Sequence, residues 1–212
     1  NQLIALIPFF LGRKFLATPE GMRALVVAMV TAGLIYSFPM IVEARLSPQI
    51  NVWVYGFFQH DFGQTMRGGG FRPVVFMPHG LWVAFFALMA VMSALILLRE
   101  AEAAERPKRL AIWVYLMLVL ALCRSTGPMV YALALIPVIL VLPRRLQALV
   151  AAGLAVIVIS YPLLRGAHLV PLDRILEMAL SYSAERHQSL EFRIVNEEAL
   201  LARAMEKPWF GW

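Results

Sequence analysis

The chain is poor in charged residues and almost lacks cysteine. Charged residues make up 15% of its 212 residues and hydrophobic residues 61%, and the mean hydropathy is +0.73. A soluble domain has about 25% charged and about 45–50% apolar residues, so the composition excludes an ordinary soluble domain and predicts a polytopic membrane protein. The single cysteine, Cys123, cannot form an internal disulfide. Its place at the end of an apolar run is typical of a buried packing residue.

No Asp, Glu, Lys or Arg lies near the middle of the long apolar runs. A helix needs about 20 such residues to cross a bilayer. Four runs come close to this length: residues 24–42, 80–98, 125–143 and 146–164. The run 110–123 is shorter and spans if its flanking arginines snorkel, and residues 3–11 suggest the end of one more span. The sequence therefore predicts an all-α fold, a transmembrane bundle of about five full spans and a partial N-terminal span, with no β-sheet.

Lysine and arginine are shared unevenly between the loops. If residues 13–23 face the cytoplasm, the cytoplasmic loops hold Arg13, Lys14, Arg23, Arg99, Arg106, Lys108, Arg109, Arg144 and Arg145. The opposite side holds only Arg45, Arg67, Arg72 and Arg124 before the tail. This split follows the positive-inside rule. We therefore expect residues 1–164 to form the bundle, with an outer loop at 43–72, and residues 165–212 to form a helical segment on the outer side.

Nothing in the polar segments calls for a metal, a cofactor or a nucleic acid. His60, Asp61 and His79 could meet and hold a metal ion, but a polar loop with hydrogen-bonded histidines is the more common explanation. The net charge of +6 is explained by basic loops and phosphate-binding arginines, without a basic stripe interleaved with aromatic residues. The sequence starts inside an apolar run without an initiator Met, so a fragment of a longer protein is expected.

Positive charge gathers at the predicted outer boundary of the membrane. Arg72 and His79 precede one apolar run, and Arg124 ends another. A guanidinium group binds phosphate through paired charge-assisted hydrogen bonds, and the diphosphate of a lipid carrier lies at this depth. The alternative is that each arginine snorkels to lipid headgroups and binds nothing specific.

The tail is predicted to be helical from about Leu172. At about 100° per residue, Arg186 and Arg193 fall within about 20° of each other, and Glu197 follows at a similar angle. An amphipathic helix in solvent would show the same pattern. After Pro208, which ends the helix, Trp209 suits the membrane interface or the face of a sugar ring.

Three segments resemble the O-antigen ligase and polymerase-like family of bacterial membrane proteins. The most specific resemblance is in the tail, "RHQSLEFRIVNEEALLARAMEKPWFGW", which follows the family pattern of Arg, two residues, Ser-Leu, a second Arg, a helix and a Pro-led turn. The segment "CRSTGPMVYALALIPVILVLPRR" resembles the family hairpin that precedes this tail. The segment "RPVVFMPHGLWVAFF" resembles its outer loop, with Pro-His-Gly where the family has a signature like His-Pro-Asn.

The resemblance implies a glycosyltransferase of the bacterial inner membrane with its site on the periplasmic side. Such enzymes transfer a glycan from undecaprenyl diphosphate to a glycan or lipid acceptor, without a metal or a nucleotide sugar. The residues expected to be catalytic are Arg186 and Arg193, which match the family motif, and Glu191 and Glu197, which are candidates by their chemistry. In the family the candidate base is a histidine after the Pro-led turn, which in this chain would lie beyond Trp212. The implied substrate-binding residues are Arg124, Arg72, His79, Ser189 and Trp209. Either glutamate could orient the acceptor hydroxyl or take its proton.

Two other classes of protein remain open. A polysaccharide or lipid transporter would place ionisable residues in the middle of its spans, or break its helices there. A membrane scaffold with an amphipathic tail would depend on no single arginine of that tail. The sequence leaves the choice between polymerase and ligase open, together with the sugar and the acceptor.

Overall fold

The chain folds almost entirely into helices. The computed structural model describes residues 2–167, 169–182 and 184–207, and 78% of the chain is helical. It divides into two units, Asn1–Pro143 and Arg144–Trp212, which we describe separately. The domain boundary predicted at residues 164 and 165 assigns the last apolar helix to the bundle, whereas the structure groups that helix with the tail.

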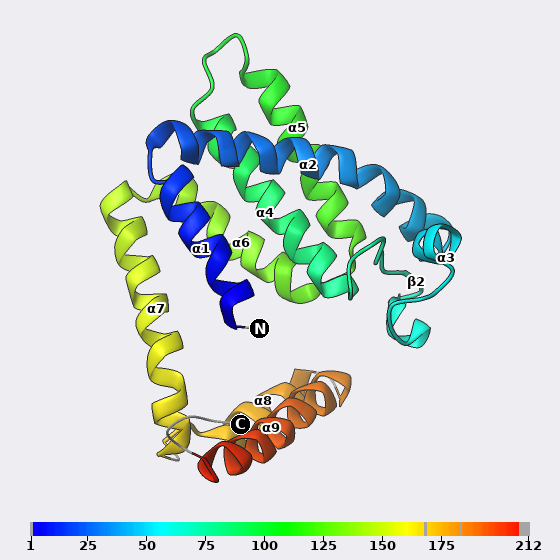
Figure 1. Cartoon of the computed structure of the whole chain (residues 1–212), viewed down its shortest axis with the longest axis vertical. Coiled ribbons are helices and arrows are strands. Elements are labelled where there is room, and N and C mark those ends of the chain that lie inside the picture. Colours follow the sequence, from blue (N-terminus) through cyan, green and yellow to red (C-terminus); the bar gives the residue numbers. More distant parts are fainter. Residues whose placement is uncertain (1, 168, 183, 208–212) are drawn as a thin grey trace. The chain divides into compact units, whose positions relative to one another are not determined.

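Each predicted apolar run coincides with a helix (Figure 1), which confirms the all-α prediction. Unit 1 contains α1 (Gln2–Phe15), α2 (Pro19–Leu46), α3 (Ile50–Tyr55), α4 (Gly80–Arg99), α5 (Arg106–Leu122) and α6 (Thr126–Val141). Unit 2 contains α7 (Arg144–Gly166), α8 (Leu172–Tyr182) and α9 (Ala184–Met205). Among the described residues, α2, α4 and α7 are long and apolar enough to cross a membrane. Helices α5 and α6 have only 17 and 16 residues, so the count of five full spans stays a prediction.

Local sequence determines where α2 begins and which side it buries. The hydroxyl of Thr18 accepts a hydrogen bond from the Gly21 N–H at 3.1 Å, and Pro19 takes the first helical position. The buried residues recur every three or four positions: Val30, Gly33, Ser37, Met40 and Glu43. This stripe faces α4, because a Cβ on Gly33 would lie 2.5 Å from the Cβ of Ala90. Glycine at position 33 therefore lets the two helices approach closely.

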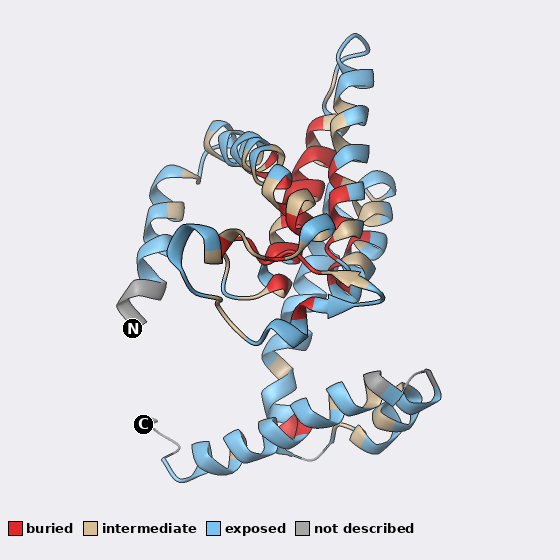
Figure 2. Cartoon of the chain, turned by 90° about the vertical axis from the view of Figure 1, so that its right-hand side faces the viewer, coloured by how far each residue is buried: buried red, intermediate tan, exposed pale blue. Residues whose placement is uncertain are grey.

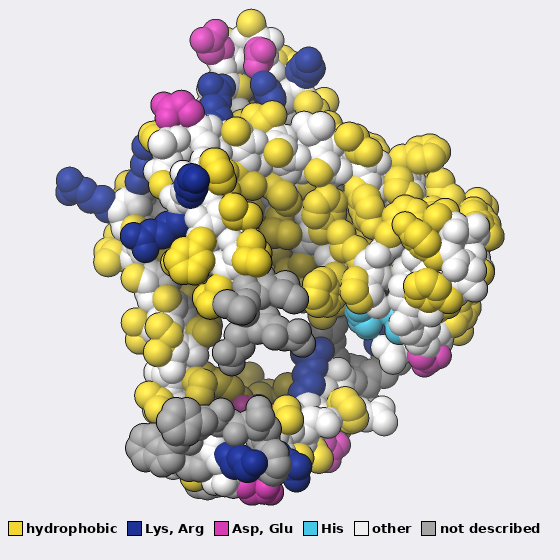
Figure 3. Space-filling model, viewed as in Figure 1, with side chains coloured by type: hydrophobic (Ala, Val, Ile, Leu, Met, Phe, Trp, Pro, Cys, Tyr) yellow, Lys and Arg dark blue, Asp and Glu magenta, His cyan; other side chains and the backbone are white. Residues whose placement is uncertain are grey.

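Helix α4 lies at the centre of unit 1, with α2, α5 and α6 around it (Figure 1). The buried residues concentrate on these helices, whereas the helices of unit 2 are largely exposed (Figure 2). A hydrogen bond of 2.7 Å between the hydroxyls of Ser37 and Tyr115 joins α2 to α5. Hydrophobic side chains also cover much of the exposed surface of this unit (Figure 3). Such a surface is expected of helices that face lipid, since a soluble protein rarely exposes large apolar patches.

The predicted outer loop, residues 43–72, is ordered by short elements. It includes the end of α2, α3, a 3₁₀ helix η1 (Phe62–Thr65) and two strands, β1 (Met66–Arg67) and β2 (Gly70–Phe71). The strands pair antiparallel through a two-residue turn in which Gly68 and Gly69 have φ of +52° and +73°. The expectation of no β-sheet is therefore wrong for this small hairpin. Two glycines between paired residues favour this kind of turn, because it needs positive φ at both central positions.

The tail forms two helices rather than one continuous helix from Leu172. Helices α8 and α9 lie side by side and run in opposite directions (Figure 1). Leu172, Leu176 and Ala179 are half-buried on α8, and Ile194 is buried on α9. The predicted helix over residues 186–203 is confirmed, since α9 covers all of it.

Candidate functional site

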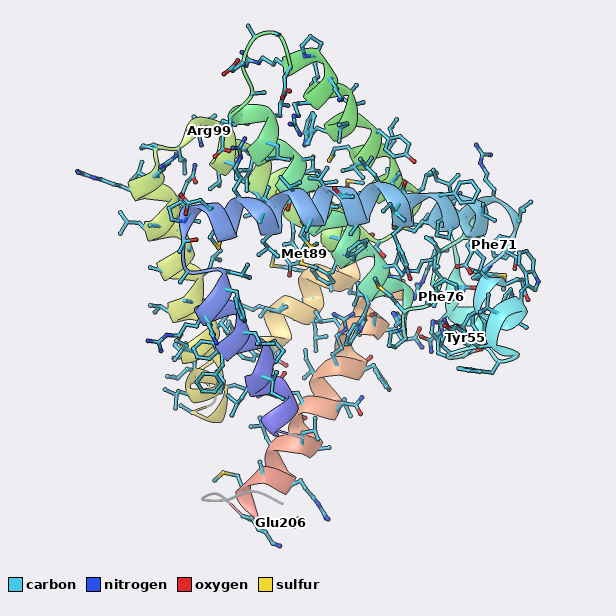
Figure 4. The ribbon with its side chains drawn as sticks, turned by 45° about the horizontal axis from the view of Figure 1, so that its top comes forward. Tyr55, Phe71, Phe76, Met89, Arg99 and Glu206 are labelled. Atoms are coloured by element: carbon cyan, nitrogen blue, oxygen red, sulfur yellow. The ribbon has the colours of Figure 1, made fainter. Side chains whose placement is uncertain are left out.

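One end of unit 1 is closed by residues 43–79 and by the turn between α5 and α6, residues 123–125. We call this region the outer cap. In Figure 4, Tyr55, Phe71 and Phe76 lie together in this region, Met89 lies midway along α4, and Arg99 lies at the opposite end of that helix. The rings of Tyr55 and Phe76 meet edge to face, with their centroids 5.7 Å apart. The outer cap thus brings residues from the loop, α3 and the ends of the long helices into one place.

Glu43 anchors the outer cap. Its side chain is 1% exposed, and its carboxylate accepts three backbone hydrogen bonds from two separate segments. The N–H of Ile50 donates to Oε1 at 3.0 Å, and those of Val74 and Val75 donate to Oε2 at 2.8 and 2.7 Å. Glu43 is not among the predicted site residues, because it was assigned to the loop. Its position on the buried stripe of α2 was the available signal, because helical periodicity predicts that Glu43 faces inward.

The backbone around Val75 is unusual for a branched residue. Val75 has φ of +52°, a region that branched side chains avoid. This conformation turns two successive N–H groups toward the same carboxylate oxygen, as in the backbone concavities that bind anions. The amide of Gln59 donates to the Val75 carbonyl at 2.7 Å. The strained backbone is thus held by a side chain from α2 and a side chain from the loop.

Arg72, predicted to bind substrate, is buried and joins two parts of the outer cap. It is 8% exposed, and its Nε and Nη2 donate to the hydroxyl of Ser125 at 3.0 and 2.5 Å. Its aliphatic stem lies against Gly80, where a Cβ would come within 2.8 Å of it. Burial lowers the pKa of the Arg72 guanidinium, and the neighbouring charge of Arg67 lowers it further.

Arg124, the second predicted substrate-binding arginine of unit 1, holds the β-hairpin. It lies in the turn before α6 with φ of +47° and donates through Nη1 to the carbonyls of Arg67, at 3.0 Å, and Gly68. A Cβ on Gly70 would lie 2.5 Å from Nη2 of Arg124, so any side chain at position 70 would displace this guanidinium. Both predicted arginines therefore organise the outer cap itself.

Arg67 also lies in the outer cap and is not among the predicted site residues. Its side chain is exposed and makes no hydrogen bond or ion pair with the residues that the structure describes. It lines a shallow depression of about 290 Å³ formed by residues 66–71. Within the described parts of unit 1, no carboxylate forms an ion pair with Arg67, Arg72 or Arg124. The outer cap holds four arginines against the two carboxylates Glu43 and Asp61, so its net charge is positive, which suits an anionic ligand.

His79, also predicted to bind substrate, caps α4 and stacks on a second histidine. Its Nδ1 accepts a hydrogen bond from the Leu81 N–H at 3.0 Å, and its Nε2 lies 3.3 Å from Oε1 of Gln64. Its ring centroid is 4.7 Å from that of His60, whose Nδ1 lies 2.8 Å from the carbonyl of Asp61. Since Nδ1 of His79 accepts, we assign its proton to Nε2. No group of three His, Cys, Asp or Glu side chains able to hold a metal occurs in the described part of the chain.

The outer cap is expected to lose stability in mild acid. Burial lowers the pKa of His79 from its ordinary value of 6.5, and His60, Arg72 and Arg67 lower it further. The stabilisation from neutral His79 is therefore complete above pH 6.5 and is lost as the pH falls toward the folded-state pKa. The melting temperature of the full chain in detergent, measured from pH 7.5 to pH 5.5, should fall.

The control for this pH effect is His79→Asn, since Asn also caps helices but does not titrate. The variant should show a smaller fall in melting temperature over the same pH range. An equal fall in both proteins would mean that other groups cause the acid sensitivity.

In unit 2, the predicted site residues of α9 divide between two sides of the helix. Arg193 is exposed and has no hydrogen bond or ion pair with any residue that the structure describes. Glu197 lies about 40° from it around the helix, whereas Glu191 lies about 160° away and pairs with His187 at 3.7 Å. Ser189 is exposed. The backbone of Arg186 belongs to α9, but its side chain and the whole of Trp209 lie outside the residues that the structure describes.

Glu197 takes part in a cluster that ties α9 to the end of α7. The hydroxyl of Tyr161 donates to its Oε2 at 3.0 Å, and Nε of Arg165 lies 3.8 Å from its Oε1. Arg165 is 5% exposed and also pairs with Glu198 at 2.9 Å. Arg165 is not among the predicted site residues, because nothing in the spacing of residues 165 and 198 shows that they meet.

The structure brings the predicted residues Arg72, Arg124 and His79 together in the outer cap, and Arg193 and Glu197 together on α9. The first group belongs to unit 1 and the second to unit 2. A comparison of the chain with family models, curated proteins and solved structures returns no match.

Proposed function

We propose that the chain transfers a glycan from a lipid-linked diphosphate to an acceptor hydroxyl at the outer face of a bacterial inner membrane. The observation that carries this proposal is the cluster of Arg67, Arg72 and Arg124 at one end of an apolar helix bundle, with no carboxylate paired to it in the described part of unit 1. In a lipid-linked diphosphate, the charged diphosphate lies at the end of such a bundle and the hydrocarbon chain of the lipid lies along the helices. The resemblance of the tail to the O-antigen ligase and polymerase-like family supports the same reaction.

In this reaction the bond between the anomeric carbon and the phosphate oxygen breaks, and the diphosphate leaves with the electron pair. The acceptor oxygen forms the new bond to the anomeric carbon and gives up its proton to a base. Fixed guanidinium groups stabilise the negative charge that develops on the leaving diphosphate. In the outer cap we assign this task to Arg67. Arg186 and Arg193 of the tail are assigned it independently, from the resemblance of their segment to the family motif alone. Glu197 is favoured over Glu191 as the base, because it lies on the side of α9 that carries Arg193.

Arg72 and Arg124 serve the site by holding its backbone. Arg72 binds Ser125, and Arg124 binds the carbonyls of the β-hairpin. Together they fix residues 66–71, and the Arg67 side chain on this segment is exposed to solvent. This support fixes the backbone on which the Arg67 side chain is carried.

Arg67→Ala in the full-length protein is expected to reduce glycan transfer by about 100-fold, the scale seen when one charge-stabilising group is removed. The guanidinium has no partner in the described structure, so the amount of folded protein in the membrane should not change. Transfer is measured as new glycan product per amount of membrane protein.

The matched control is Arg45→Ala, an exposed arginine at the end of α2. Arg45 lies in the last turn of α2, outside residues 66–72 and 123–125, which carry the cluster. We expect transfer by Arg45→Ala to be close to normal. Equal activity in both variants would remove the outer cap from the proposed site.

A further inference from the structure

The hairpin of α8 and α9 has two unlike sides. The helices pack through half-buried and buried residues: Leu172, Leu176, Ala179, Leu190 and Ile194. On α8, Ile175 and Met178 lie on one flank of this packed side. On α9, Arg193 and Leu200 lie within about 20° of each other, on one flank of the side of α9 that packs against α8. Because the helices are right-handed and antiparallel, these two flanks point to the same side of the hairpin, which we call the Met178 face.

The Met178 face is apolar and basic. Met178 is 72% exposed and Leu200 is 70% exposed, and Ile175 adds a third accessible apolar side chain. Arg193 lies among them without a partner in the described structure. Exposed apolar residues beside an arginine are typical of a helix that lies in the boundary between lipid headgroups and acyl chains.

The opposite face of the hairpin carries the carboxylates. Asp173 and Glu177 of α8 lie about 140° and about 100° from Met178, and Glu191 and Glu198 of α9 lie about 150° from Arg193. Carboxylates favour water over an anionic lipid surface. Leu180 and Val195 are also exposed on this face, so it is the distribution of charge, and not of apolar side chains, that distinguishes a lipid-facing side from a water-facing side.

The hairpin is also tied to a helix that is long and apolar enough to cross a membrane. Helix α7 ends at Gly166 and α8 begins at Leu172. The five residues between them reach at most about 18 Å when fully extended. The ion pairs of Arg165 with Glu197 and Glu198 hold α9 against the last turn of α7. The hairpin thus stays within reach of the headgroups of any membrane that α7 crosses.

We infer that the hairpin of α8 and α9 lies flat on the membrane that α7 crosses, with its Met178 face against the lipid. Ile175, Met178 and Leu200 enter the boundary between headgroups and acyl chains, and Arg193 lies at the depth of the lipid phosphates. The inference goes beyond the proposed function and does not depend on it. If the proposed function holds, this depth places Arg193 where the diphosphate of a lipid carrier lies.

The test uses single cysteines in the full chain, labelled with an environment-sensitive fluorophore and reconstituted in phosphatidylcholine and phosphatidylglycerol liposomes. Met178→Cys and Leu200→Cys report on the Met178 face, and Glu177→Cys and Glu191→Cys report on the acidic face. All four side chains are exposed, so the substitutions do not disturb buried packing. Cys123 is buried, so the parent chain provides the labelling blank.

Nitroxide-labelled phosphatidylcholine should quench the labels at 178 and 200 about twofold or more relative to those at 177 and 191, because only the former enter the lipid boundary. Aqueous iodide should show the opposite order. Quenching by iodide that is equal at all four positions would overturn the inference. So would stronger lipid quenching on the acidic face. Neither result bears on glycan transfer, so failure of the inference and failure of the proposed function are distinguishable.

Discussion

Replacing Glu43 with alanine is expected to destabilise the outer cap more than any other single change in unit 1. The substitution leaves the N–H groups of Ile50, Val74 and Val75 without their acceptor. Each buried donor without a partner costs about 1–3 kcal/mol, so we expect a loss of about 3 kcal/mol or more in the free energy of unfolding. Val75 would then be free to leave its strained φ of +52°. Thermal unfolding in detergent measures the loss, and hydrogen exchange over residues 69–80 locates it.

Two variants control this prediction. Glu43→Gln keeps one oxygen for Val74 and Val75 but places an amide donor opposite the Ile50 N–H, so its loss should be smaller than that of alanine. Glu102→Ala removes an exposed carboxylate from the turn before α5 and should leave stability unchanged. If hydrogen exchange over residues 69–80 is the same in Glu43→Ala and the parent, Glu43 does not hold the outer cap.

Replacing Arg193 with lysine is expected to lower glycan transfer almost as much as replacing it with alanine, by about 100-fold. A lysine ammonium is a point charge and cannot form the paired hydrogen bonds of a guanidinium with a diphosphate. Because Arg193 is exposed and unpaired in the described structure, both variants should reach the membrane in normal amounts. Product is measured per amount of membrane protein.

A snorkelling role for Arg193 predicts the reverse, since lysine snorkels as well as arginine does. Near-normal transfer by Arg193→Lys would therefore show that Arg193 only anchors α9 at the membrane. Arg174→Ala is the matched control, because Arg174 is an exposed arginine on the neighbouring α8. It lies outside α9 and outside the tail segment that resembles the family. Its transfer should be unchanged.

The helices could be predicted from the sequence because each depends on a local run of apolar residues. The runs at 24–42 and 80–98, for example, fall within α2 and α4. The predicted helix through Arg186 and Arg193 is also present, because its apolar positions repeat at helical spacing. The break between α8 and α9 was missed, since this segment has no Pro or Gly to mark it.

The outer cap could not be predicted, because its contacts join residues far apart in the chain. Glu43 binds the backbone of Val74 and Val75, and Arg72 binds Ser125. No local pattern reveals such pairs. The predicted residues Arg72 and Arg124 do lie in this region, but as supports for the hairpin from which the unpredicted Arg67 extends.

The most direct test of the proposed reaction measures the carrier lipid and the new glycosidic bonds together. Purified full-length protein in liposomes receives undecaprenyl diphosphate-linked glycan and acceptor, in the presence of a chelator. The account predicts that free undecaprenyl diphosphate and glycosidic bonds form in equal amounts, and that Arg67→Ala and Arg193→Ala lower both. Movement of intact lipid-linked glycan across the bilayer without bond formation or release of the carrier would contradict it.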